Sequence, residues 1–301
     1  MQNNHLLNDF AVQHGITLGV CDAAPLFYFE NKAVPFVRTD KEKRTDPCAV
    51  MPGCTSIIVI GVPIQKHDDN GFPKVPETTE NIEVSSLVFP DYHKIVKSIL
   101  YELAQALKPI IKGFKHRILV DSGSLDERQL AARAGIGVYG KNGLIISPEF
   151  GSWFNIGIML TNITHDAMLH VLNHSVYTAS ADACGFFDGF QTASCPSGCD
   201  ACIQACPTGA IAENGSIHVD LCISYLTQKD TLTEQESALL HNQLFGCDVC
   251  RQVCPMNASM KKQFINRAEL LSMSDDEILE HYAHTGIMWR GAGILRRNAK
   301  L

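Results

Sequence analysis

Two stretches of this 301-residue sequence share one cysteine spacing. Residues 199–207 read Cys-Asp-Ala-Cys-Ile-Gln-Ala-Cys-Pro, and residues 247–255 read Cys-Asp-Val-Cys-Arg-Gln-Val-Cys-Pro. In the shared pattern Cys-x2-Cys-x3-Cys-Pro, three thiols on one tight loop can point at a common centre, and the proline ends that loop. Cys195 lies just upstream of the first stretch and Cys222 lies between the two, so the set contains eight cysteines.

Eight thiolates match the ligands of two [4Fe–4S] clusters, and the spacing is that of bacterial ferredoxins, in which the cysteine before the proline ligates the other cluster. This rule predicts a first cluster on Cys199, Cys202 and Cys254, completed by Cys195. It predicts a second cluster on Cys206, Cys222, Cys247 and Cys250. Structural zinc is disfavoured because a zinc site has no reason to repeat Cys-Pro. A disulfide framework is disfavoured because the chain is long and some of its 12 cysteines lie scattered elsewhere.

The fourth ligand of the first cluster stays open between two residues. Three residues separate Cys195 from Cys199, where the bacterial pattern has two. The small residues of that insert, Pro-Ser-Gly, let the loop bulge and still deliver the sulfur. Cys184 is the alternative ligand, although an ordinary buried thiol is its simpler interpretation. The same interpretation applies to the remaining cysteines, Cys21, Cys48 and Cys54.

Composition limits the classes of protein to which this chain can belong. Hydrophobic residues make up 46% of it, enough for a sizeable core, and the net charge of −7 disfavours a broad nucleic-acid-binding face. With no apolar run of membrane-spanning length and no basic-then-apolar leader, we expect a cytoplasmic protein. The end of the chain carries basic residues without acidic ones, either as a solvated tail or as a phosphate-contacting patch: Arg290, Arg296, Arg297 and Lys300.

The order of predicted elements indicates an α+β chain. We expect a mixed α/β domain over residues 1–180, a dicluster ferredoxin-type domain over 181–262, and a helical segment with a basic tail over 263–301. In the first domain, Ser56–Val62 is a continuous apolar run typical of a strand buried on both faces. Residues 65–91 contain several prolines and many polar residues, and we expect them to form a loop.

A further strand and helix are predicted in the middle of the first domain. Arg117–Val120 reads as a strand that leads directly to Asp121. Ser124 and Glu127 have the spacing of a capping box, in which the serine starts a helix and the glutamate reaches back to it. We therefore expect a helix from Ser124 that stops at Gly135.

Residues 135–140, Gly-Ile-Gly-Val-Tyr-Gly, fit the string Gly-x-Gly-x-x-Gly. That string binds dinucleotides only where it follows a strand and opens a helix. Here it follows a predicted helix and leads into a strand. We therefore expect a tight turn in which the backbone closely approaches another part of the chain, and no nucleotide site.

Asp121 and Arg128 are polar residues concentrated in apolar surroundings. A carboxyl group at a strand end, facing a helix start, can donate a proton if burial raises its pKa. Alternatively, Asp121 only caps the turn at Ser122-Gly123. These residues alone leave both roles open.

Several segments resemble the epoxyqueuosine reductase family. The most specific block covers residues 120–153 and contains Asp121-Ser-Gly, Lys141-Asn142 and Ser147-Pro-Glu-Phe-Gly-Ser152. Three other segments match the family as well: Asp91-Tyr-His93, Cys222-Ile-Ser-Tyr-Leu-Thr-Gln228 and Phe245-Gly-Cys-Asp-Val-Cys250.

The resemblance implies two [4Fe–4S] clusters and a cobalamin, with its lower base detached, bound by the first domain. Electrons from a flavodoxin or ferredoxin would reach the cobalamin, and an epoxide on the wobble nucleoside of tRNA would be reduced. Asp121 matches the family's proton donor, which fits the need of an opening epoxide for a nearby acid. His93 is expected to be a polar wall contact and not a cobalt ligand. The implied cobalamin-binding positions are Arg44, His93, Arg128, Lys141, Asn142, Ser224 and Asp248.

Two departures from the family bear on the substrate. Typical members continue past the position of Leu301 into a helical-repeat domain that helps to hold tRNA, so we expect a short form. Ser85–Pro90 lacks the arginine or tryptophan that usually precedes Asp-Tyr-His. Reduction of epoxyqueuosine in tRNA is therefore the leading hypothesis, and reduction of a small molecule, as by a reductive dehalogenase, is the alternative. A non-enzymatic electron carrier is a third, which the intact Asp121 and Lys141-Asn142 oppose.

Overall fold

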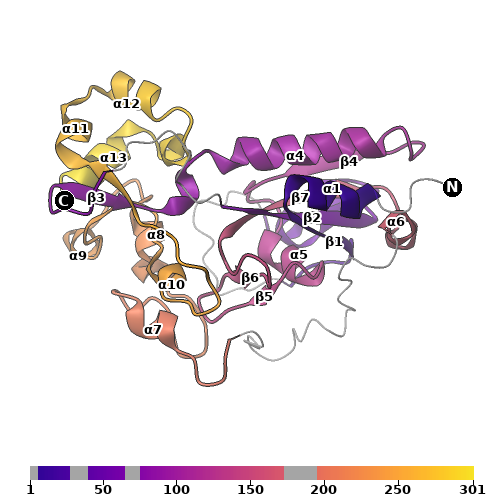
Figure 1. Ribbon diagram of the computed structural model, residues 1–301, viewed down its shortest axis with the longest axis horizontal. Coiled ribbons are helices and arrows are strands. Elements are labelled where there is room, and N and C mark those ends of the chain that lie inside the picture. Colours follow the sequence, from indigo (N-terminus) through magenta and orange to yellow (C-terminus); the bar gives the residue numbers. More distant parts are fainter. Residues whose placement is uncertain (1–5, 28–39, 65–74, 173–194) are drawn as a thin grey trace. The chain divides into compact units, whose positions relative to one another are not determined.

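The computed structural model describes residues 6–27, 40–64, 75–172 and 195–301. Two units divide the chain (Figure 1): Met1–Pro63 with His93–Pro196, and Ile64–Tyr92 with Ser197–Leu301. The second unit thus takes in a segment from the middle of the first predicted domain. The domain boundaries that the sequence analysis places after residues 180 and 262 remain predictions.

A four-stranded antiparallel sheet forms the centre of the first unit. Its strand order is β1 (Thr17–Asp22), β2 (Ser56–Pro63), β7 (Phe154–Thr161) and β4 (His116–Leu119). Every residue of β2 except the final Pro63 is buried, so the predicted two-faced strand is confirmed. The β-branched run suits this central position because both of its faces pack against other side chains.

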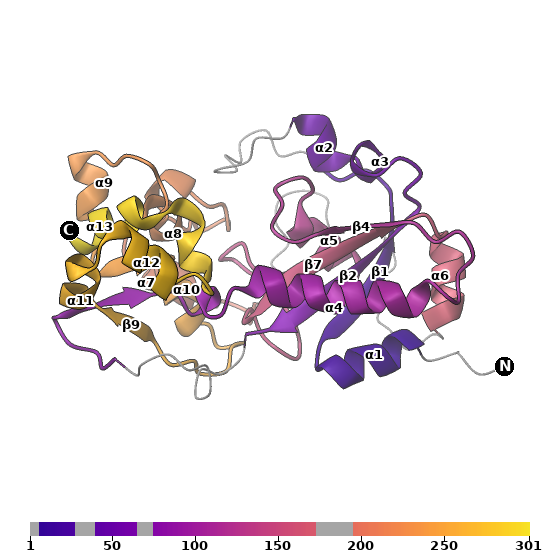
Figure 2. The same ribbon diagram turned by 90° about the horizontal axis from the view of Figure 1, so that it is seen from above.

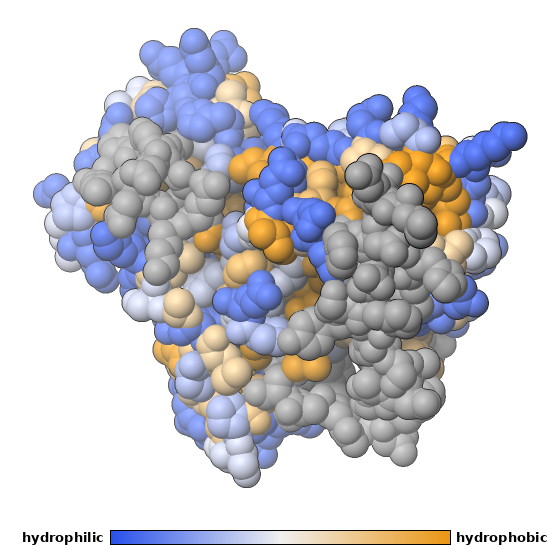
Figure 3. All heavy atoms as spheres, turned by 45° about the vertical axis from the view of Figure 1, so that its right-hand side comes forward, coloured by the Kyte–Doolittle hydropathy of each residue, from blue (hydrophilic) through white to orange (hydrophobic). Residues whose placement is uncertain are grey.

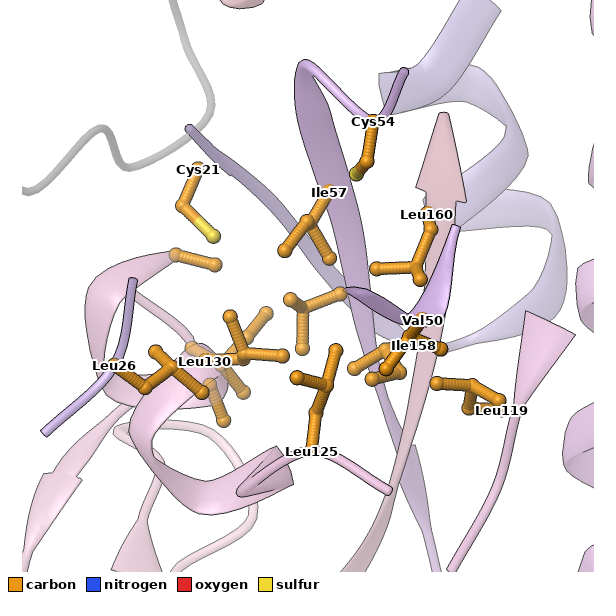
Figure 4. Close-up of a cluster of buried hydrophobic side chains, with 14 of the residues drawn as sticks. Cys21, Leu26, Val50, Cys54, Ile57, Leu119, Leu125, Leu130, Ile158 and Leu160 are labelled. Carbon is orange, nitrogen blue, oxygen red and sulfur yellow. The ribbon is translucent and has the colours of Figure 1, made fainter. Parts of the chain in front are cut away.

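Helices cover both faces of this sheet. On one face, α5 (Glu127–Arg133) packs against β1, β2 and β7, and Figure 4 shows Leu130 in one cluster of buried side chains with Ile57 and Ile158. Successive residues of a strand point to opposite faces, so Gly157 faces the other way. There it lies under Val96 and Leu100 of α4 (Tyr92–Leu107), which crosses the sheet in Figure 2.

The remaining elements of the first unit are short. A two-stranded hairpin, β5 (Val138–Tyr139) with β6 (Ile145–Ile146), follows α5. The other helices are α1 (Leu6–His14), α2 (Lys41–Thr45), α3 (Pro47–Val50) and α6 (His165–Leu172).

The Gly-x-Gly-x-x-Gly string forms the tight turn that the sequence predicts. It connects α5 to β5, and Gly135 adopts a φ of 75°, which favours glycine. A Cβ at Gly137 would lie 2.4 Å from the carbonyl oxygen of Ile146, on the partner strand of the hairpin. The absence of a side chain at Gly137 therefore allows its backbone to approach that of Ile146 closely.

Gly137→Ala should destabilise the protein by about 2 to 3 kcal/mol, because the overlap involves a main-chain oxygen that cannot rotate away. Thermal unfolding of both proteins would measure the loss. Gly293→Ala is the matched control: it lies in a helix, nothing lies within 4 Å of an added Cβ, and its stability should stay the same or rise slightly. An unchanged melting temperature for Gly137→Ala would contradict the close approach.

The second unit contains a three-stranded sheet in the order β8 (Gln243–Phe245), β3 (Asn81–Val84) and β9 (Gln263–Asn266). β3 is parallel to β8 and antiparallel to β9. The prediction that residues 65–91 form only a loop is therefore wrong for β3. The reason is long-range: four residues between prolines form a strand because two partners more than 150 positions later pair with both of their edges.

Short helices surround that sheet. They are η1 (Ser86–Val88), α7 (Ala201–Ala205), η3 (Val219–Leu221), α8 (Ile223–Leu226), α9 (Glu234–Ala238), α10 (Val249–Gln252), α11 (Arg267–Ser272), α12 (Asp275–His281), η4 (Gly286–Arg290) and α13 (Ala292–Ala299). Buried Ile82 and Val84 of β3 share a hydrophobic core with Leu295 of α13.

The basic end of the chain is built into this second unit. Arg296 pairs with Asp275 at 2.9 Å and donates to two carbonyl groups of the α11 end. Arg297 donates to the carbonyl oxygen of Lys229 at 2.6 Å, and Arg290 pairs with Asp230. These three arginines therefore hold the C-terminal helices in place and do not form a solvated tail, whereas a phosphate contact stays a prediction.

No helix within the described ranges is both long and apolar enough to cross a membrane. Figure 3 shows one face of the protein, on which hydrophilic residues are interspersed with smaller hydrophobic areas.

Candidate cluster and proton-donor sites

Four cysteines that the sequence assigns to the second cluster lie together in the second unit. The thiols of Cys206, Cys247 and Cys250 all lie within electrostatic range of the thiol of Cys222. These side chains come from three separate loops. That these four thiols ligate one cluster, as the cross-ligation rule requires, stays a prediction.

Burial and backbone donors distinguish these thiols from ordinary surface cysteines. Burial raises the pKa of Cys222, raises that of Cys247 to about 12, and raises that of Cys250 further. Backbone N–H groups of Ser224 and Tyr225 donate to Cys222, and that of Val249 donates to Cys247. Because burial favours the neutral form of Cys222, Cys247 and Cys250, binding iron as thiolates would release protons. N–H···S bonds to the cysteines are among the contacts that set cluster potentials.

Of the cysteines predicted for the first cluster, Cys199, Cys202 and Cys254 belong to the second unit. α7, which contains Cys202, packs against α10, which contains Cys250 and leads to Cys254. Cys195 belongs to the end of the first unit, where its sulfur lies 3.5 Å from the backbone nitrogen of Lys141. Cys184, the alternative ligand, lies outside the described residues. In the parts of the chain that the structure describes, no three His, Cys, Asp or Glu side chains converge on a single metal-ion position.

Asp121 follows β4 in a conformation that few non-glycine residues adopt. Its φ is 46°, in the left-handed region that aspartate and asparagine tolerate better than most side chains. Its side chain is 69% exposed, so a substrate can reach the carboxyl group. The Nε2 atom of His93 lies 3.8 Å from Asp121 Oδ2. Arg44 fixes the next turn, because its Nη1 donates to the carbonyl oxygen of Gly123 at 3.0 Å.

The predicted capping box at Ser124 is wrong, and as a result the side chain of Glu127 is not engaged in capping the helix. α5 begins at Glu127 and is capped by Asp126, whose carboxylate accepts from the backbone N–H of Gln129 at 3.2 Å. Asp126 caps the helix in place of Ser124 because a carboxylate at a helix N-terminus is stabilised by the helix dipole as well as by the hydrogen bond.

Glu127 instead turns its carboxyl group toward the Asp121 loop. It accepts the backbone N–H groups of Asp121 and Ser122, while its Oε1 atom is buried without a hydrogen-bond partner. Burial, reinforced by the charge of Asp121, raises the pKa of Glu127 to about 8. The sequence analysis missed this residue as a part of the site. The sequence did contain a signal, an acidic residue six positions after Asp121, but that residue was interpreted as the second member of the capping box.

Arg128, Lys141 and Asn142 surround the turn that precedes β6. Arg128 Nη1 donates to the carbonyl oxygen of Gly143 at 2.9 Å. The buried side chain of Asn142 accepts from the backbone N–H of Leu144 at 3.2 Å. All three predicted residues therefore belong to the α5–β6 region of the first unit, and Arg128 and Asn142 shape the turn themselves.

Ser224 and Asp248 lie beside cluster cysteines in the second unit. The carbonyl oxygen of Ser224 accepts from the side chains of Thr227 and Gln228 at 3.1 and 2.6 Å. Asp248 is buried, and its two oxygens accept from Ser85 Oγ at 2.8 Å and from the Ser86 backbone N–H at 2.6 Å. Asp248 thus ties the Cys247 loop to the segment that follows β3. A cobalamin contact at either residue stays a prediction.

Two family models match separate stretches of the chain. Residues 195–257 match the family model of a 4Fe-4S double cluster binding domain, and residues 44–122 match that of epoxyqueuosine reductase QueG, DUF1730. The predicted α+β fold with a dicluster module is confirmed.

Individual relatives extend the similarity along most of the chain. An epoxyqueuosine reductase of Bacillus cereus is 33% identical over 281 residues, which are 88% of this chain and 68% of the relative. One of Staphylococcus aureus is 30% identical over 97% of this chain and 77% of its own length. A crystal structure of an epoxyqueuosine reductase with an epoxyqueuosine-modified tRNA-Tyr stem loop superposes with a TM-score of 0.78 and 28% identity, covering 98% of this chain and 79% of that one. The cysteine pattern, the fold and these matches together show that the chain belongs to the epoxyqueuosine reductase family.

Proposed function

We propose that this protein is an oxidoreductase that converts epoxyqueuosine in tRNA to queuosine. The observation that carries the proposal is the match of 98% of the chain to an epoxyqueuosine reductase that holds a modified tRNA stem loop. The site supports it chemically. Removal of an epoxide oxygen as water consumes two electrons and two protons, and this chain has thiols for electron-transfer clusters and an accessible carboxyl group.

In this proposal Asp121 is the proton donor. The breaking carbon–oxygen bond leaves negative charge on the epoxide oxygen, and a carboxyl group nearby stabilises that oxygen by transferring a proton. The exposed side chain of Asp121 and the fixed backbone around it suit this role. The Nε2 atom of His93 lies 3.8 Å from Asp121 Oδ2, on the same side of the loop.

Two [4Fe–4S] clusters would deliver the electrons one at a time. Cys206, Cys222, Cys247 and Cys250 would hold the second cluster, and all four are partly buried, as the ligands of such a group would be. Cys195, Cys199, Cys202 and Cys254 would hold the first. A flavodoxin or ferredoxin-type protein in the cytoplasm is the proposed electron donor.

Cobalamin is the proposed second cofactor, and when bound it would supply a strongly nucleophilic, two-electron-reduced metal centre. The residues of the first unit fit such a guest in chemical character. Arg44, Arg128 and Asn142 carry N–H donors of the kind that the amide groups of a corrin ring accept. Each also contacts the backbone near Asp121 or Gly143, so their side chains have defined positions.

The test is conversion of a synthetic anticodon stem loop that carries epoxyqueuosine. Protein reconstituted anaerobically with iron, sulfide and cobalamin should, with a chemical reductant, yield queuosine, seen by mass spectrometry as the loss of one oxygen atom. The affinity for the stem loop should fall steeply, by tenfold or more, between 50 and 200 mM salt, because phosphate contacts release counterions. A stem loop with unmodified guanosine is the control substrate. Absence of conversion, together with no complex near physiological salt, would refute the tRNA substrate.

A further inference from the structure

The loop that carries Asp121 is held from three directions within the first unit. Arg44 binds the carbonyl oxygen of Gly123 at 3.0 Å. His93 lies 3.8 Å from the Asp121 carboxylate. Glu127 accepts the backbone N–H groups of Asp121 and Ser122. Of these contacts, only that of Glu127 reaches the main chain of Asp121 itself.

The conformation of Asp121 explains why such a contact matters. A residue with a φ of 46° is in a sparsely populated region, and the surrounding structure must stabilise it there. In this conformation the backbone N–H groups of Asp121 and Ser122 point to a common position, so one carboxyl group can accept a hydrogen bond from each. A carboxyl oxygen buried without a partner is costly, so the placement of Glu127 Oε1 is not explained by folding stability.

We propose that Glu127 is a positioning residue that holds Asp121 in its left-handed conformation, with the carboxyl group directed toward the substrate. This inference rests on the proposed function, because it gives the reason why the proton donor has a fixed orientation. Glu127 touches neither substrate nor cofactor in this assignment. It acts through the main chain of Asp121.

The assignment predicts different effects of two substitutions on the Asp121 loop. Glu127→Gln retains a carbonyl oxygen that can accept the same N–H groups, whereas Glu127→Ala removes the acceptor. Glu102→Ala is the matched control, since Glu102 lies on the exposed side of α4 and contacts His14 at 3.7 Å, in the same unit. Thermal unfolding of each variant identifies any that fail to fold.

Hydrogen exchange of the cofactor-reconstituted protein gives the first readout. In Glu127→Ala the amides of Asp121 and Ser122 should exchange at least tenfold faster, while Glu127→Gln and Glu102→Ala should stay close to the parent protein. Kinetics give the second. In Glu127→Ala, kcat should fall at least tenfold with KM for the stem loop within about twofold, because the donor loses its orientation while tRNA contacts persist. Glu127→Gln should retain most of kcat.

Unchanged exchange of these amides in folded Glu127→Ala would overturn the proposal. So would a loss of kcat in Glu127→Gln equal to that in Glu127→Ala, since that result would assign Glu127 a proton of its own in the reaction. The exchange arm does not depend on turnover. If the parent protein reduces no epoxyqueuosine, the proposed function fails while the contact between Glu127 and the Asp121 loop is still tested.

Discussion

Asp121→Asn should lower turnover of the epoxyqueuosine stem loop by about a hundred- to ten-thousandfold, the usual range for loss of a general acid. Asparagine has the same shape and tolerates the left-handed region, so the φ of 46° and the backbone N–H donation to the Glu127 carboxylate should persist. Only the transferable proton is lost. Single-turnover assays of the pre-reduced enzyme would measure chemistry separately from electron delivery.

The control for that experiment is Asp9→Asn, at an exposed position of α1 in the same unit. It should turn over like the parent protein. Both variants should keep the same iron content and the same affinity for the stem loop, because Asp121 belongs to neither predicted cluster. Full turnover by Asp121→Asn would remove this residue from the mechanism, and a loss of tRNA affinity would assign it to binding.

Cys222→Ser should reduce the iron content from about eight to about four atoms per chain, because this cysteine is one of the predicted ligands of one four-iron cluster. Serine is a poor ligand in a site that softer thiolates select. Loss of one cluster interrupts electron delivery, so activity with a protein electron donor should be abolished. Iron and sulfide analysis and the visible spectrum of anaerobically prepared protein would measure the effect.

Cys48→Ser provides the comparison, since Cys48 is an exposed free thiol of the first unit outside both predicted ligand sets. Its iron content should equal that of the parent protein. The cross-ligation rule adds a sharper expectation: Cys254→Ser should affect the same cluster as Cys199→Ser, although the two residues belong to different motifs. Eight irons retained in Cys222→Ser, or a Cys254 variant that behaves like a Cys250 variant, would contradict the ligand assignment.

The buried carboxyl of Glu127 shows where sequence reasoning about this site fails. A capping box is a local pattern, and Ser124 with Glu127 satisfies it. The folded chain starts α5 at Glu127, because Asp126 is the stronger cap, and Glu127 then reaches the loop that precedes the helix. The choice of cap therefore decides whether Glu127 closes a capping box or contacts the Asp121 loop.

The amino-acid sequence alone determined the features that depend on short spacings. The repeated Cys-x2-Cys-x3-Cys-Pro run predicts the clusters, and the apolar run of β2 predicts the central strand. The position of Asp121 directly after a predicted strand indicates a candidate site residue. Tertiary structure decided the rest: that β3 is a strand, that the terminal arginines bind carbonyl groups, and that Glu127 meets Asp121. The physical reason is that spacing along the chain limits which neighbours can share a loop or a turn, whereas partners far apart in sequence are chosen only when the whole chain packs.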